Sequence, residues 1–83
     1  MNFHRYTIMD KTKTYQYNWS DYEGYISWSI IFKTWRWSVN SLSTDYTDFR
    51  SHIDIDLDTP KDAEEDMMYE IRTHLGSTPE SQF

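Results

Sequence analysis

Polar and apolar residues alternate along much of the chain, and the period of the alternation predicts secondary structure. Residues 3–9 are rich in aromatic and β-branched side chains, which favours a strand, and residues 10–13 read as a polar turn. Aromatic side chains then alternate with polar ones over residues 15–19, the period-2 pattern of a half-buried strand. We expect a turn over residues 20–24, so a meander of hairpins begins here.

Residues 25–39 contain a change of phase. Their apolar side chains first occupy one parity and then, from Ile31 onward, the other. A shift of one residue moves every later side chain to the opposite face of a sheet, so two structures fit. We prefer one long strand that bends at a β-bulge near residues 31–33. The alternative is two strands joined by a tight turn around residues 33–34, which contain no Gly, Pro, Asn or Asp.

The next two segments differ in pattern. Residues 40–51 are rich in Ser, Thr and Asp, which predicts a loop with at most one helical turn, capped by Ser43 or Thr44. In residues 53–57, Ile and Leu alternate with Asp, and this is the clearest strand pattern in the chain. Such a strand would have one apolar face and one acidic face.

A helix is predicted to follow. Thr59 suits the N-cap and Pro60 the first helical position, while Gly76 suits the C-cap. Between them, apolar residues recur every four positions and form one stripe: Ala63, Met67, Ile71 and Leu75. The expected fold is a single α+β domain over residues 1–76, in which a bent antiparallel sheet of three to four strands packs against one C-terminal α-helix. We expect residues 77–83 to be a flexible tail.

Composition supports a folded chain that is poor in aliphatic residues. Only 37% of the 83 residues are hydrophobic, but these include four Trp, seven Tyr and four Phe. Since each enclosed ring buries roughly 150–250 Å², aromatic side chains can build the core that Leu and Val do not. There is no cysteine, no signal-peptide-like apolar run and no stretch long enough to cross a membrane. We therefore expect a cytoplasmic protein.

A single helix covers only one face of a sheet, yet aromatic residues occupy both parities of the predicted strands. We therefore expect some rings to remain accessible to solvent or to contact another subunit: Tyr15, Tyr17, Trp19, Trp35 and Trp37.

Four acids stand at positions 1, 3, 5 and 12 of a calcium-loop pattern: Asp54, Asp56, Asp58 and Glu65. Position 6 is Thr59 rather than the Gly that the sharp turn needs, and no helix precedes the segment. The alternation of Ile and Leu with Asp favours a strand instead. The sequence therefore predicts no metal site here.

The sequence contains no recognisable catalytic motif either. The histidines His4, His52 and His74 show no ligand spacing, there is no thiol, and no Ser lies in a Gly-x-Ser-x-Gly turn. The acids fall on surfaces expected to be solvated, where paired carboxylates lack the burial that separates their pKa values. We expect a protein that is not an enzyme and needs no cofactor.

Charge is sorted along the chain. Residues 1–40 carry five basic and three acidic side chains, whereas residues 41–83 carry three basic and eleven acidic ones, a net charge of −8. Concentrated like charge raises the free energy of a folded domain, and a basic partner would relieve it. Alternate residues of a strand lie about 6.6–6.8 Å apart, comparable to the spacing of phosphates along one nucleic-acid strand. The candidate docking groups are Asp54, Asp56, Asp58, Asp62, Glu65 and Asp66, with Trp35 and Trp37 as apolar anchors.

These features predict a small acidic inhibitor that binds the basic, nucleic-acid-binding surface of a partner protein. In being small, acidic, cysteine-free and rich in aromatic residues, the chain resembles the inhibitors that phages use against host nucleases, restriction enzymes or CRISPR complexes. One alternative is a homo-oligomeric structural module that pairs through an aromatic sheet face. A second is a single-strand nucleic-acid binder that uses Trp28 to Trp37, which the net charge of −6 opposes.

Overall fold

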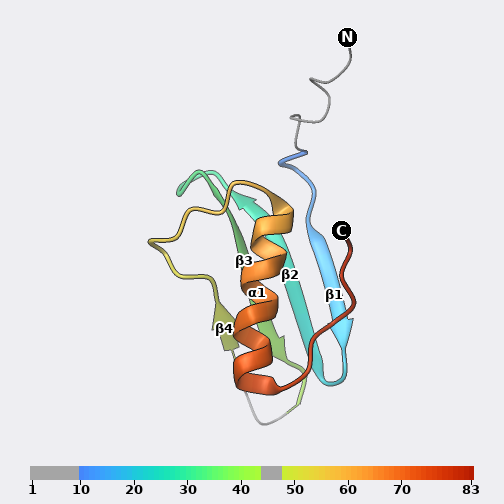
Figure 1. The fold of residues 1–83 in the computed structure, drawn as a ribbon. Coiled ribbons are helices and arrows are strands. Elements are labelled where there is room, and N and C mark those ends of the chain that lie inside the picture. Colours follow the sequence, from blue (N-terminus) through green and yellow to red (C-terminus); the bar gives the residue numbers. More distant parts are fainter. Residues whose placement is uncertain (1–9, 44–47) are drawn as a thin grey trace.

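The fold is a four-stranded antiparallel sheet with one helix packed across it (Figure 1). The computed structural model describes residues 10–43 and 48–83, so the strand predicted at residues 3–9 lies outside the described residues. The elements follow the chain in the order β1 (Tyr15–Trp19), β2 (Tyr22–Ser29), β3 (Thr34–Ser41), β4 (Asp48–Arg50) and α1 (Pro60–Leu75). The strands lie in the same order in the sheet. The predicted α+β class, with one C-terminal helix, is confirmed.

The first hairpin is tighter than predicted. Trp19 pairs with Tyr22 across a two-residue turn, in which Ser20 adopts a left-handed φ of 49°. The next residues, expected in the turn, belong to β2. Gly24 is among them because a Cβ there would lie only 3.3 Å from the Trp19 ring and 3.5 Å from the Met67 sulfur. The missing side chain lets α1 approach the sheet closely.

The bent strand expected over residues 25–39 is wrong; the alternative of two strands is correct. β2 and β3 form a hairpin, and the turn is closed by the Lys33 N–H, which donates to the Ser29 carbonyl at 2.8 Å. The register pairs Ile26 with Trp37 and so places even positions of β2 beside odd positions of β3. The change of phase is therefore a chain reversal. The turn forms without Gly, Asn or Asp because Lys33 itself adopts the left-handed conformation, with a φ of 54°.

All of the core lies between one face of the sheet and α1. Its members are Tyr17, Ile26, Trp35, Trp37, Val39, Leu57, Ala63, Met67 and Ile71. Because the register gathers these apolar side chains on one face, the expectation that some of the five named rings remain accessible holds only in part. Trp35 and Trp37 are only 0% and 3% exposed, whereas Tyr15 and Trp19 are half-buried at the edge of the core.

The strand predicted at residues 53–57 is also wrong. The Ser51 N–H donates to the Trp37 carbonyl at 3.0 Å, and the Trp35 N–H donates to the Leu57 carbonyl at 3.0 Å. Six steps along this segment therefore cover two steps along β3, so the segment must bulge away from the sheet. A short strand, β4, forms instead within the region expected to be a loop, and Thr44, one of the two expected caps there, lies outside the described residues.

The helix agrees with its prediction at both ends. The Thr59 hydroxyl accepts a hydrogen bond from the Asp62 N–H at 3.0 Å, and Pro60 occupies the first turn. Gly76 has a φ of 76°, and its N–H donates to the Arg72 carbonyl at 3.2 Å. The N-terminal and central part of the predicted apolar stripe, from Ala63 to Ile71, is buried, and Leu75 is half-buried.

A buried acid connects α1 to the C-terminal tail, residues 77–83. Glu64 is 4% exposed and accepts hydrogen bonds from the Tyr17 hydroxyl at 2.7 Å, the Ser81 hydroxyl at 2.5 Å and the Gln82 N–H at 2.8 Å. Burial by itself would raise the pKa of Glu64, but these hydrogen bonds outweigh it and hold the pKa below its ordinary value. The same burial and the contact with Glu64 raise the pKa of Tyr17.

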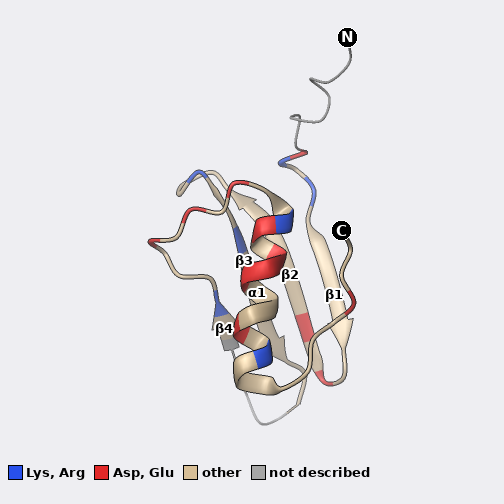
Figure 2. Cartoon of the chain, in the orientation of Figure 1, with Lys and Arg blue, Asp and Glu red and all other residues tan. Residues whose placement is uncertain are grey.

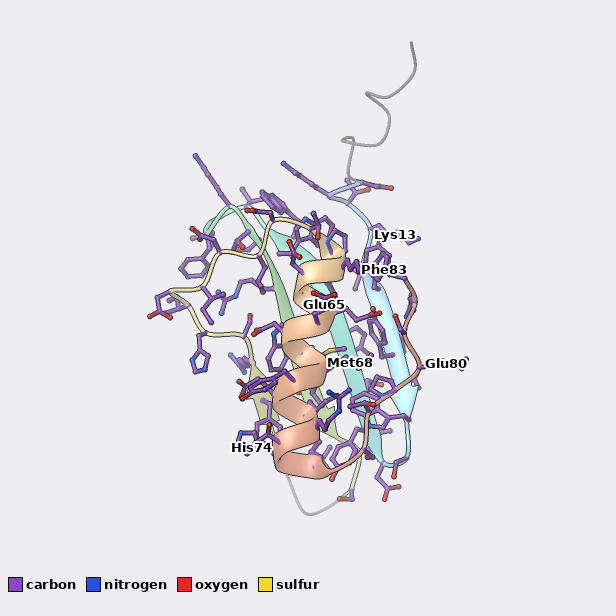
Figure 3. The ribbon with its side chains drawn as sticks, viewed as in Figure 1. Lys13, Glu65, Met68, His74, Glu80 and Phe83 are labelled. Atoms are coloured by element: carbon purple, nitrogen blue, oxygen red, sulfur yellow. The ribbon has the colours of Figure 1, made fainter. Side chains whose placement is uncertain are left out.

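The tail, predicted to be flexible, lies along β1 in the structure. The Gln82 side-chain amide donates to the Gln16 carbonyl at 2.6 Å, and the Phe83 ring lies 5.1 Å from the Tyr15 ring. The Lys13 ammonium lies over the other side of this cluster, 4.7 Å from the Tyr15 ring centroid, and Figure 3 shows Lys13 and Phe83 close together. The tail therefore contributes to the packing at the β1 edge.

Glu64→Gln should lower the free energy of unfolding by roughly 1.5–3 kcal/mol at pH 7, because an amide weakens three hydrogen bonds made to a charge. Glu65→Gln is the matched control, since Glu65 is exposed and one residue away.

The pKa of Glu64 is lower in the folded protein than in the unfolded chain, where it is about 4.3. The charge therefore stabilises the fold above that pH, and its contribution disappears as the pH falls through the folded-state pKa. Urea unfolding across pH measures both effects; equal losses for the two variants would contradict them.

Candidate functional site

Five exposed carboxylates run along the bulged loop and into the first turns of α1. We call this set the acidic surface; it consists of Asp54, Asp56, Asp58, Asp62 and Glu65. Figure 2 shows the acidic positions along the loop that precedes α1 and at the start of the helix. Glu65 carries its side chain on the outer side of α1 (Figure 3). Five of the six predicted acids are therefore exposed along this loop and helix start.

The sixth acid points inward. Asp66 is half-buried and accepts a hydrogen bond from the indole Nε1 of Trp37 at 2.7 Å. This bond satisfies the only polar atom of a buried ring, so Asp66 stabilises the core. Two carboxylates between Asp54 and Glu70, those of Glu64 and Asp66, therefore stabilise the fold.

The acidic surface lacks local compensation. Within the described residues, none of its five carboxylates takes part in an ion pair, and the ion pair found there joins His74 to Glu70 at 3.6 Å, near the opposite end of α1. Lys61 is the single basic residue between Asp54 and Asp66. The negative potential of this surface is therefore available to a partner.

Two anchors hold the loop that carries the first three acids. At its end, Leu57 is buried, and its N–H donates to the Thr34 hydroxyl, which in turn donates to the Leu57 carbonyl at 3.0 Å. At its start, the Arg36 guanidinium donates to the Ser51 carbonyl at 2.8 Å. The loop between these points is thus fixed at both ends and presents its acids to solvent.

The two predicted aromatic anchors are not on this surface. Trp35 and Trp37 lie in the core, so the expectation of exposed anchors there is wrong. The structure instead leaves Ile53 65% exposed next to the first acid of the loop. Sequence reasoning missed Ile53 because the alternating pattern placed its side chain on the buried face of a strand.

Loss of the strand also removes the regular row of carboxylates. The comparison with phosphate spacing assumed alternate residues of an extended strand, and residues 51–59 form an irregular loop. The acids of the acidic surface therefore lie along an irregular loop and a helix start, without strand periodicity.

The structure also weakens the case for the two alternative functions, a homo-oligomeric module and a single-strand nucleic-acid binder. The aromatic face of the sheet, expected to be free for a homodimer, is covered by α1, and two of the tryptophans between Trp28 and Trp37 are buried. Trp28 remains half-buried, with the Lys11 ammonium 4.1 Å from its ring centroid. A row of stacking platforms for bases is absent from this part of the sheet.

The described part of the chain holds no group of three or more His, Asp or Glu placed to bind a metal ion. His4 lies outside it. His74 stacks on Phe49, with ring centroids 5.0 Å apart. Nor does this part of the chain include a helix with the length and apolar character needed to cross a membrane.

No family model, curated protein or solved structure matches this chain. A function has to be argued from the chemistry of its own surfaces.

Thr34→Val should loosen the loop while keeping the shape of the side chain. The buried Leu57 N–H loses its acceptor, which costs about 1–3 kcal/mol. Thr73→Val is the control, because the Thr73 hydroxyl bonds to the Tyr69 carbonyl on the exposed side of α1. Thermal unfolding measures stability, and amide hydrogen exchange should show faster exchange at Leu57. An unchanged exchange rate there would contradict the anchoring role of Thr34.

Proposed function

We propose that this protein is a non-enzymatic inhibitor that binds through its acidic surface to the basic, nucleic-acid-binding surface of a partner protein. One observation carries the proposal: five exposed carboxylates, none of them ion-paired within the described residues, follow one another along a loop anchored at both ends and into the helix after it. An ordered array of charge loses little conformational entropy on binding.

Electrostatics supports this choice of partner. The segment from residue 41 to residue 83 has a net charge of −8, and a complementary basic surface lowers the repulsion within it. Complementary charge also accelerates association, by about 10–1,000-fold at low salt. A basic surface of this kind is common where proteins bind nucleic-acid phosphates.

Ile53 supplies the apolar contact in this proposal. An exposed isoleucine beside Asp54 can enter a pocket on the partner, while the surrounding acids form a polar rim. The acidic surface can bind in a groove for nucleic acid if its charge is complementary to that of the groove. A regular spacing of the carboxylates is not needed, so the irregular path of the loop is compatible with such binding. Since the proposed targets act on intracellular nucleic acid, we place this activity in the cytoplasm.

Charge reversal tests the proposal. The triple variant Asp54→Lys, Asp56→Lys, Asp58→Lys should slow association with the partner by at least tenfold and reduce its dependence on salt. The control is Asp10→Lys, Asp21→Lys, Glu80→Lys, which changes the net charge equally at exposed positions outside the acidic surface.

The partner is first isolated from source cells with the wild-type protein as bait, and association is then followed by stopped-flow fluorescence. A short DNA duplex should compete with the wild-type protein for the partner. Equal association rates for the two triple variants, or no competition by DNA, would rule out docking through the acidic surface.

A further inference from the structure

The face of the sheet opposite α1 contains a hollow of about 540 Å³. It lies across β2, β3 and β4 and is flanked by Phe32 from the β2–β3 turn and by Ile53 from the bulged loop. In the described part of the chain no helix covers this face, because α1 packs on the other one. A hollow of this size suits a small-molecule ligand.

The register explains which side chains line the hollow. Positions that alternate with the core residues point to this face, so Ser27 pairs with Arg36, and Tyr25 pairs with Ser38, which pairs with Arg50. All five line the hollow, together with Asn40. Two of the eight basic residues of an acidic chain thus meet here, and no Asp or Glu is among the described residues that line it.

Arg36 is fixed in position. Its Nη2 donates to the Ser51 carbonyl at 2.8 Å and its Nη1 to the His52 carbonyl at 3.5 Å, and its Cζ lies 4.9 Å from the centroid of the Phe32 ring. These contacts leave further N–H groups of the five on an arginine for a ligand. A guanidinium held in this way can form paired hydrogen bonds to a phosphate with little loss of side-chain entropy.

Tyr25 and Glu23 lie two residues apart on β2 and so face the same side of the sheet. The neighbouring Glu23 carboxylate raises the pKa of the Tyr25 phenol. Glu23 does not line the hollow, whereas Tyr25 does. Phe32, 43% exposed, provides a second aromatic surface at the rim.

We infer that this hollow, which we call the arginine hollow, is a binding site for a mononucleotide. Arg36 and Arg50 face the phosphates, and the rings of Phe32 and Tyr25 contact the base. Asn40 and the two serines provide hydrogen-bonding groups for the sugar and the base edge. A single nucleotide fits within the hollow, whereas a longer nucleic acid would extend over a molecule of net charge −6.

This site goes beyond the proposed inhibitor function but adjoins its surface, because Arg36 also anchors the bulged loop and Ile53 flanks the hollow. Arg50 takes no part in the acidic surface, so a loss of ADP binding in Arg50→Gln tests the hollow separately. Its probes are ADP, adenosine and pyrophosphate, added to the full chain and followed by amide chemical shifts. ADP should saturate with a Kd below about 1 mM, with shifts centred on residues 25–27, 36–40 and 50. Adenosine and pyrophosphate should each bind at least tenfold more weakly.

Arg50→Gln should weaken ADP binding by about 10–100-fold, the effect of losing hydrogen bonds between charged groups. Arg36→Gln should do the same; because Arg36 also anchors the loop, Arg50→Gln is the decisive variant if Arg36→Gln unfolds. Lys61→Gln is the control, since it removes the same charge from an exposed position on α1 and should leave the Kd unchanged.

Five results would overturn the inference. They are the absence of saturation by ADP, shifts centred on Lys11 and Lys13, an equal loss of affinity in Lys61→Gln, binding of pyrophosphate or adenosine as tight as that of ADP, and full ADP affinity in Arg50→Gln.

Discussion

The packing of α1 against one face of the sheet is the interaction on which the remaining features depend. Trp35, Ile26 and Val39 are fully buried beneath Met67 and Ile71, and burial of such side chains contributes about 1.5–3 kcal/mol each. Gly24 permits the close approach, since its missing Cβ leaves room for the Met67 sulfur. The interface between α1 and the sheet buries the apolar side chains of the core. The other face of the sheet and the outer side of α1 can therefore carry polar side chains.

Polar contacts attach the peripheral segments to this interface. Glu64 holds the C-terminal tail, Asp66 holds the indole of Trp37, and Thr34 holds the end of the bulged loop. Glu64 and Thr34 are buried and Asp66 is half-buried. Away from water, a hydrogen bond to a charge or to an otherwise unpaired N–H is worth more than at the surface. The acids of the run from Asp54 to Glu70 thus divide into inward ones that serve the fold and outward ones that are available for binding.

Local patterns predicted much of the fold, and tertiary pairing decided the rest. The caps at Thr59 and Gly76 and the apolar stripe of α1 depend on neighbours within a few residues, so the sequence contains the information. The turn around residues 33–34 was the less favoured alternative because it contains no Gly, Pro, Asn or Asp, and Lys33 adopts the left-handed conformation in their place. The segment from Ile53 to Leu57 has a strand pattern, but Ser51 before it bonds to Trp37 and Leu57 at its end bonds to Trp35, so the residues between them do not pair with β3. The acids of the acidic surface were predictable, whereas the arginine hollow depends on the register between β2, β3 and β4.

The tryptophan rings of β3 lie on the inner face of the sheet, and the acids of the acidic surface project outward from an ordered scaffold. Solvent paramagnetic relaxation by a neutral gadolinium chelate tests both parts at once. We expect the indole protons of Trp35 and Trp37 to be protected, and the amides of Asp54, Asp56 and Asp58 to relax as fast as those of the exposed residues 30–31. Rapid relaxation of the two indoles, or protection of all three aspartate amides, would contradict this arrangement.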